Sequence, residues 1–350
     1  MIPGAAPGAP RSVSLLASLS VSLLAALANA MTWVLALAGF LVKGGIILVL
    51  APIVVVPSAV GLANLVAPTL TAMVFGGISG EVLTTVALIV VALASWLVLG
   101  GLTAAAVEAE GALVIARDED VVGGGGRPAW PARPGTTMRI LLARAIAAGP
   151  LVIALAAGSI RVVAIAYREL TVPSDVAAPL VLRIVRGAPE AIAWIILTWI
   201  LAEIVGALAT RRIVLAGEGV MAALGGSVRQ IVRSPLRAIV AFVVPLAVLV
   251  GVLVPSTAAS VVGWDTIRAT IANDGGPVAV GAWIAIFVGL WAGGLVLIGM
   301  ACAWRSAIWT VEVARTFGGV PTGRPGDWTP TADTATLTSL RPHEADPDPR

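Results

Sequence analysis

The sequence predicts an all-α integral membrane protein with a bundle of six transmembrane helices. Hydrophobic residues make up 59% of the 350 residues and charged residues 12%, about half of the usual charged share. Long runs are nearly free of charge: residues 191–209 carry only Glu203, and at 1.5 Å per residue this run spans roughly 30 Å, the thickness of a bilayer core. Arginines lie where such runs end, and arginines at these positions fix the orientation of a protein in the membrane.

The arginines that follow the 191–209 run set the expected topology. Short loops rich in Lys and Arg stay in the cytoplasm, so this helix should run from outside to inside. We therefore expect a multi-pass protein of a bacterial inner or plasma membrane with both termini cytoplasmic. The arginines concerned are Arg211, Arg212, Arg229, Arg233 and Arg237.

The membrane domain is expected at 31–315. Its spans are expected at about 31–56, 82–106, 139–167, 189–210, 236–254 and 278–303. The first span is interrupted by Lys43-Gly44-Gly45, so it is either one tilted helix or two short helices hinged at the glycines. One helix is favoured, because two full spans would invert every later helix. Pro255 is expected to end the fifth span and to open an outside loop at 256–278.

The first 30 residues are expected to be disordered or to lie at the membrane surface. Residues 12–30 end in Ala28-Asn29-Ala30 and have two interpretations, a surface helix or a cleaved secretory signal. The surface helix is favoured, because cleavage would invert the topology.

The connecting segments are expected to be interfacial or flexible. Four consecutive glycines predict that 107–136 is a flexible cytoplasmic linker. Residues 318–350 are rich in Pro, Gly, Thr and Asp, which predicts a disordered cytoplasmic tail. Amphipathic segments at 177–188 and 213–235 are expected to lie at the outer and the cytoplasmic surface.

A weak internal repeat suggests that the spans form three repeated helical hairpins. Pro52, Pro150 and Pro245 lie in the odd-numbered spans at nearly equal spacing, and each follows a basic residue by a few positions.

Small residues recur every four positions along the sixth span. Because small side chains let helix backbones approach closely in lipid, this stripe is expected to face the bundle interior. A pore lined by glycine backbone is the weaker alternative. The stripe consists of Gly281, Ala285, Gly289 and Gly293.

Several ionisable residues fall inside the predicted spans, and Lys43 and Glu203 are the best candidates for a functional role. A lone charge at mid-helix costs roughly 2.5–3.5 kcal/mol on the insertion scale, so each residue needs a partner or access to water. We expect the two to pair, directly or through water; the alternatives are snorkelling of Lys43 to the interface and a role in transport. A separate cytoplasmic belt of salt bridges is expected from Glu108, Glu110, Arg211, Arg212 and Arg305.

Other chemistries have little support in the residue types. Cys302 is the single cysteine and His343 the single histidine, and no span carries two carboxylates in a catalytic arrangement. We therefore expect no catalytic residue, no metal and no cofactor. The formal net charge is only +3 and the arginines lie at helix ends, which favours contact with anionic lipid over nucleic acid.

The segment between the fourth and fifth spans reads RRIVLAGEGVMAALGGSVRQIVRSPLRA. With the order of spans and loops over residues 30–315, it resembles uncharacterised bacterial six-helix proteins. It is also similar to the membrane domain attached to some glycerophosphodiester phosphodiesterases. The resemblance implies a six-helix membrane fold. It implies no site residue, because the catalytic domain of those enzymes is absent from this sequence.

The leading function hypothesis is a non-enzymatic, transporter-like or accessory membrane subunit. The second is a scaffolding module that binds a partner helix or lipid, and the weakest is a membrane-embedded enzyme. The expected partners are the lipid bilayer, anionic lipid at the cytoplasmic arginines, and another membrane protein. A water-accessible cavity that reaches Lys43 or Glu203 would favour transport, whereas a dry, tightly packed bundle would favour scaffolding.

Overall fold

The computed structural model describes residues 14–50, 53, 80–118, 135–172, 174–175 and 178–317. Over these residues the chain is helical and without strands, and six of its helices are long and apolar enough to cross a membrane. The predicted fold class is therefore confirmed. The elements are α1 (Leu15–Ala28), α2 (Ala30–Phe40), the short π-helix η1 (Leu41–Gly45), α3 (Ile46–Leu50), α5 (Gly80–Asp118), α6 (Thr136–Thr171), α7 (Leu180–Gly187), α8 (Pro189–Ala216), α9 (Val220–Arg233), α10 (Pro235–Ala272), α11 (Pro277–Ala314) and the 3₁₀ turn η2 (Arg315–Phe317).

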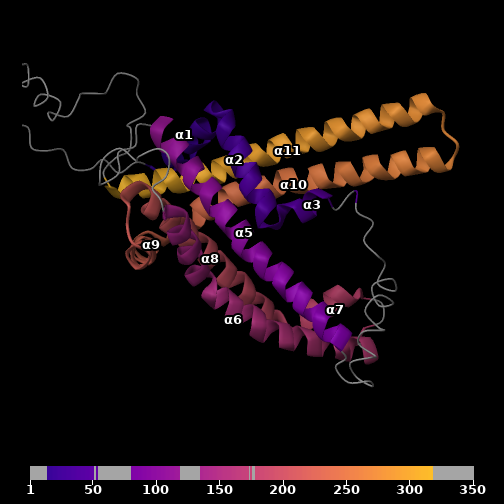
Figure 1. The fold of residues 1–350 in the computed structure, drawn as a ribbon, viewed down its shortest axis with the longest axis horizontal. Coiled ribbons are helices and arrows are strands. Elements are labelled where there is room, and N and C mark those ends of the chain that lie inside the picture. The colour runs from indigo at the N-terminus through magenta and orange to yellow at the C-terminus, as the bar shows by residue number, and fades with distance from the viewer. Residues whose placement is uncertain are drawn as a thin grey trace, which may run out of the picture.

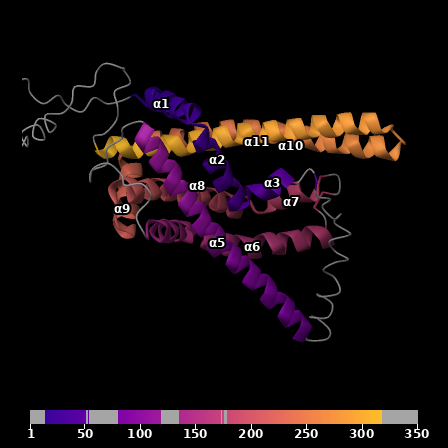
Figure 2. The same ribbon diagram turned by 45° about the horizontal axis from the view of Figure 1, so that its top comes forward.

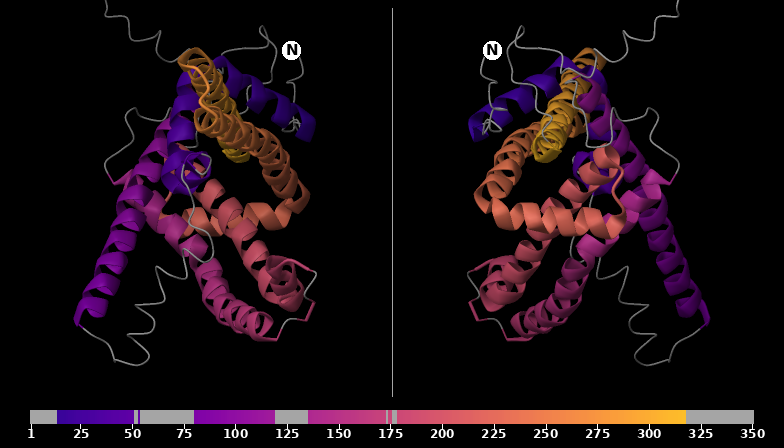
Figure 3. Two further views of the ribbon diagram at one scale, coloured as in Figure 1. Left: turned by 90° about the vertical axis from the view of Figure 1, so that its right-hand side faces the viewer. Right: turned by 90° about the vertical axis from the view of Figure 1, so that its left-hand side faces the viewer.

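The long helices form two arms that diverge from a common base next to α9 (Figure 1). One arm consists of α10 and α11, which stay side by side along their whole length in both Figure 1 and Figure 2. The other arm contains α6 and α8, while α5 leaves the base at a different angle and separates from α6 (Figure 2). The end-on views of Figure 3 show the same divergence. We call the base the α9 end and the opposite end the α7 end.

Two pairs of long helices, α6 with α8 and α10 with α11, pack side by side. The α6–α8 and α10–α11 contacts are the most extensive in the molecule, and α2 packs against α5. Pro150 and Pro245 lie inside α6 and α10. Pro52 lies outside the described residues, so the predicted threefold repeat stays a prediction.

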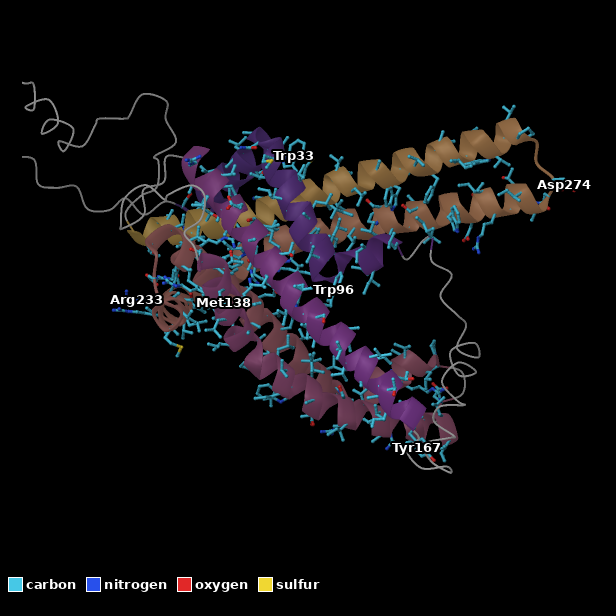
Figure 4. All side chains as sticks on the ribbon, viewed as in Figure 1. Trp33, Trp96, Met138, Tyr167, Arg233 and Asp274 are labelled. Atoms are coloured by element: carbon cyan, nitrogen blue, oxygen red, sulfur yellow. The ribbon has the colours of Figure 1, made fainter. Side chains whose placement is uncertain are left out.

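The buried core lies at the α9 end. Phe242, Leu208, Ile308 and Val313 are almost fully buried in one cluster that joins α8, α10 and α11. Farther from the base, large apolar side chains are exposed, such as Trp96 of α5, which is 53% exposed and is labelled in Figure 4. Apolar exposure on this scale requires lipid, so the arms lie in the bilayer.

Two expected boundaries are wrong. Helix α10 continues through Pro245 and Pro255 to Ala272, so residues 256–272 are helical, and only a short turn at 273–276 connects α10 to α11. A proline removes one helical hydrogen bond, and a neighbouring helix can hold the helix together across that gap, as α11 does here. Helix α5 likewise reaches Asp118, beyond the expected start of the linker at 107.

The first span breaks at its glycines. Gly44 has a φ of 106°, in a region that L side chains rarely adopt, and it lies in the π-helix η1 between α2 and α3. The span expected as one continuous helix is therefore hinged at Gly44. This hinge turns the backbone that carries Lys43.

The segment before the first span forms helix α1, which packs on α11. The indole Nε1 of Trp304 donates hydrogen bonds to Ser22 Oγ at 3.1 Å and to the Leu19 carbonyl at 3.3 Å. Asn29 separates α1 from α2, and its side chain accepts a hydrogen bond from the Met31 amide. Both interpretations of 12–30, surface helix or cleaved signal, stay predictions.

The two amphipathic segments are helical. Helix α7 lies within the 177–188 segment and α9 within 213–235, at opposite ends of the molecule (Figure 1). The predicted tail at 318–350 and most of the linker lie outside the described residues.

Candidate functional site

Glu108 joins three helices through its carboxylate. It accepts two hydrogen bonds from the Arg144 guanidinium of α6, from Nε at 2.9 Å and from Nη2 at 2.8 Å. It also forms an ion pair with the ammonium group of Lys43 from η1. Arg211 of α8 lies slightly farther away, with its Nη1 at 3.8 Å from Glu108 Oε2. One carboxylate thus faces three cations, and its side chain is only 14% exposed.

A second ion pair joins α8 to α11. Arg305 Nη2 lies 2.7 Å from Glu203 Oε2, and the Arg305 guanidinium lies over the Phe242 ring at 5.7 Å from its centroid. Arg211 also reaches α11, because its Nη2 donates to Ser306 Oγ at 2.6 Å. These contacts place both carboxylates beside cations that come from neighbouring helices.

All six charged side chains line one cavity of about 420 Å³. Its wall is formed by α2, η1, α3, α5, α6, α8 and α11, where α5 crosses the base of the two arms (Figure 1). A volume of this size is in the range of small-molecule sites, roughly 300–1,000 Å³. The charged lining residues are Lys43, Glu108, Arg144, Glu203, Arg211 and Arg305.

The rest of the wall is largely apolar. Leu35, Phe40 and Leu48 line the side of the first span, and Trp199 lies on the side of α8. Gly111 of α5 also lines the cavity, and a Cβ built there would meet no atom within 4 Å. The cavity therefore combines a charged region with an apolar wall, and small residues keep it open.

The cavity carries more positive than negative charge. Among the described residues that line it, four are cations and two are carboxylates, which leaves a formal excess of two positive charges. Arg211 is the most buried of the cations, with a side chain that is 3% exposed. Its Nε is buried and has no hydrogen-bond partner among the described residues. Buried ionic groups are normally fully paired, so this cavity is suited to an anionic guest.

Lys43 and Glu203 both line the cavity, but they are not each other's partner. Lys43 pairs with Glu108 and Glu203 pairs with Arg305, so the expected direct pair is wrong, and the pair through water stays a prediction. The hinge at Gly44 brings Lys43 to α5, and α11 brings a nearer cation to Glu203. Of the expected belt, the structure pairs Glu108 with Arg211 at 3.8 Å. Arg212 pairs instead with Glu218, and Arg305 pairs with Glu203.

The small residues around Glu108 in the sequence indicate that it is buried, although it lies just beyond the end of the predicted span 82–106. Gly101, Ala104, Gly111 and Ala112 lie three, four or seven positions from it, so small residues surround it on one helical face. A face of small residues indicates close packing, and a charge there must be buried. Arg144 also falls inside a predicted span, 139–167, but near its inner end, where an arginine is common.

The small-residue stripe of the sixth span does not face the bundle interior. Gly281, Ala285, Gly289 and Gly293 are exposed, and a Cβ on any of these glycines would meet no atom within 4 Å. The close approach to α10 occurs instead at the neighbouring Gly294, where a Cβ would lie 3.0 Å from Ser256 Cβ. Adjacent residues of a helix point about 100° apart, so the choice between Gly293 and Gly294 decides the buried face.

Two other charged clusters lie at the ends of the bundle. At the α7 end, the buried Glu169 carboxylate accepts hydrogen bonds from the Ser174 amide at 2.9 Å and hydroxyl at 2.8 Å, and Arg183 of α7 lies 3.5 Å away. At the α9 end, Arg315 pairs with Glu312 at 3.0 Å. These clusters join α7 to α6 and close the last turn of α11, which is a structural role.

Among the residues that the structure describes, no three His, Cys, Asp or Glu side chains gather as metal ligands. No family model, no curated protein and no solved structure matches this chain.

Proposed function

We propose that this multi-pass membrane protein has a transporter-like, non-enzymatic role and that the charged cavity holds its substrate. The observation that carries the proposal is the cavity itself, about 420 Å³ in volume and lined by Lys43 and Glu203. Charges inside membrane helices are costly and usually mark a substrate or ion pathway. A purely structural ion pair would need no cavity beside it.

The position of the cavity also supports transport. Its wall draws on both arms of the molecule, through α8 on one side and α11 on the other, and on the hinge at Gly44. A change in the angle between the arms would open or close such a site, as in transporters that rock two bundles around a central site. The ion pair between Glu203 and Arg305 spans the two arms and would hold them in the present arrangement.

One observation favours the alternative, a scaffolding module that binds a partner helix. The stripe of Gly281, Ala285, Gly289 and Gly293 is exposed on α11, and none of the described helices packs against it. Small residues of this kind allow close helix contact in lipid. A dimer or complex that dissociates when Gly289 is replaced by leucine, with the cavity unaffected, would favour scaffolding.

We further propose that the α9 end faces the cytoplasm of a bacterial cell. Arg212, Arg229 and Arg233 gather there around one surface hollow. Cytoplasmic loops carry an excess of Lys and Arg, and the inner leaflet offers anionic lipid to such residues. Both termini of the membrane domain would then be cytoplasmic.

The native Cys302 provides a direct test of the proposed function. It is the only cysteine in the chain and it lines the cavity. In detergent or nanodiscs, a water-soluble thiol reagent should modify Cys302 in the folded protein, and Cys302→Ala should remain unmodified. Gly111→Leu would fill the cavity and should slow the modification, whereas Gly289→Leu, on the outer face of α11, should not. If Cys302 reacts only after denaturation, the cavity is closed to water and the transport proposal is wrong.

A further inference from the structure

The charges in the cavity define the class of ligand that it would accept. We propose that the cavity binds a phosphomonoester group carried on an apolar chain, such as the head of a phosphorylated lipid. This inference rests on the proposed function, because it assumes that the cavity holds a substrate. It goes beyond that function by naming the chemistry of the substrate.

The excess of two positive charges matches a phosphomonoester. Such a group carries about −1.5 to −2 charges at pH 7, whereas a phosphodiester or a carboxylate carries one. Lys43 and Arg144 are already engaged by Glu108, and Arg305 is engaged by Glu203. Each of the two carboxylates neutralises one cation, and a doubly charged guest would neutralise the remaining two.

Arg211 provides the docking point. Its guanidinium is buried, and of its nitrogens Nη2 is bound to Ser306 while Nε has no partner among the described residues. Of the three cations that face Glu108, Arg211 is the least engaged, at 3.8 Å. The guanidinium fork matches the oxygen spacing of a phosphate and can bind it through two hydrogen bonds. A phosphate oxygen in the cavity would pair with the Arg211 guanidinium, whose charge Glu108 offsets only at 3.8 Å.

The apolar wall indicates that the phosphate is attached to a hydrocarbon chain. Leu48 and Trp199 both line the cavity and are 47% and 36% exposed on the surface of the bundle. The apolar lining therefore continues to side chains that face lipid. A chain attached to the phosphate could follow this surface into the bilayer while the head stays at the cations. Basic pockets between membrane helices bind phosphorylated lipid heads in this way.

A soluble phosphate would present the same group to Arg211 without the chain. The two sources are distinguished by testing phosphatidic acid against glycerol 3-phosphate, which share the phosphomonoester. Two further lipids with the same chains vary the charge: phosphatidylglycerol carries one negative charge and diacylglycerol carries none. The probe is the rate at which N-ethylmaleimide, an uncharged reagent, modifies Cys302 in the detergent-solubilised full chain.

We expect phosphatidic acid to protect Cys302 at the lowest concentration. Phosphatidylglycerol should need a roughly tenfold higher concentration, because it loses at least one ionic hydrogen bond. Diacylglycerol should give hardly any protection. Arg211→Gln should weaken protection by phosphatidic acid about 10- to 100-fold, and Arg211→Lys by less. Arg212→Gln is the matched control, because Arg212 lines a different hollow. It should leave protection unchanged.

Each outcome supports or overturns a defined statement. Protection by glycerol 3-phosphate equal to that by phosphatidic acid would overturn the apolar chain and keep the phosphomonoester. Equal protection by diacylglycerol and phosphatidic acid would overturn the phosphomonoester, although the cavity would still bind a substrate. No protection by any of the four compounds would also overturn it. Failure of Cys302 to react without ligand would instead count against the proposed function itself. If Arg211→Gln does not fold, the comparison of the four compounds on the wild-type chain still decides the proposal.

Discussion

Replacing Glu108 by glutamine should destabilise the bundle more than any other neutralisation of a single carboxylate in this chain. The change keeps the shape of the side chain but removes the charge that faces Lys43, Arg144 and Arg211. Two hydrogen bonds from Arg144 and one ion pair are weakened, and three cations are left with no carboxylate between them.

The expected magnitude follows from burial. Breaking a buried ion pair by removing one partner costs about 3–5 kcal/mol. The side chains of Glu108, Arg144 and Arg211 are 14%, 20% and 3% exposed, so most of this cost should apply. Lys43 is 38% exposed and can turn toward water. The unfolding free energy should therefore fall by about 3 kcal/mol, the lower end of that range.

Glu110 is the matched control, because it lies two residues away on the same helix and its buried Oε2 has no hydrogen-bond partner among the described residues, so Glu110→Gln breaks no contact of that oxygen. Unfolding free energies measured by titration with sodium dodecyl sulfate in mixed micelles should fall by less than about 1 kcal/mol for Glu110→Gln. A double-mutant cycle with Arg144→Gln should give a coupling energy of about 0.5–3 kcal/mol. The reasoning is refuted if Glu108→Gln loses no more stability than Glu110→Gln.

Three further predictions concern the hinge, the packing and the ion pairs. Gly44→Ala should lower the unfolding free energy by about 1–2 kcal/mol, because alanine is strained at a φ of 106°; no loss would argue against the hinge. Gly294→Leu should lower the melting temperature in detergent and Gly289→Leu should not, since only Gly294 faces α10; equal melting temperatures would contradict this packing. In double-mutant cycles, Lys43→Met should couple less to Glu203→Gln than to Glu108→Gln, because only Glu108 is in direct contact with Lys43; a stronger coupling to Glu203 would restore the direct pair.

The sequence was sufficient for the six helices and for two residues of the cavity. Hydropathy depends on composition alone, so the spans were found without tertiary information, and a charge such as Lys43 or Glu203 stands out against an apolar run. The ends of the spans were less predictable. Pro255 does not end α10, because α11 packs along the helix, and the sequence pattern does not give how far this contact extends.

Partner choice was not predictable because it depends on how each helix is rotated and crossed. Lys43 and Glu203 lie at comparable expected depth, but the hinge at Gly44 aims Lys43 at α5. Gly293 and Gly294 are adjacent in the sequence but point about 100° apart around the helix, so Gly293 is on the exposed stripe and Gly294 contacts α10. Such differences are fixed by the packing of distant segments.

The excess positive charge of the cavity can be measured with two thiol reagents of similar size and opposite charge. Sulfonatoethyl methanethiosulfonate is an anion and trimethylammonioethyl methanethiosulfonate is a cation, and both can react with Cys302, the only cysteine in the chain. Each rate is divided by the rate of the same reagent with a small thiol in water, which removes intrinsic reactivity. Because four cations and two carboxylates line the cavity, the anionic reagent should react faster, and Arg211→Gln should reduce its advantage. Equal normalised rates, or a faster reaction of the cationic reagent, would contradict a positively charged cavity in this membrane protein.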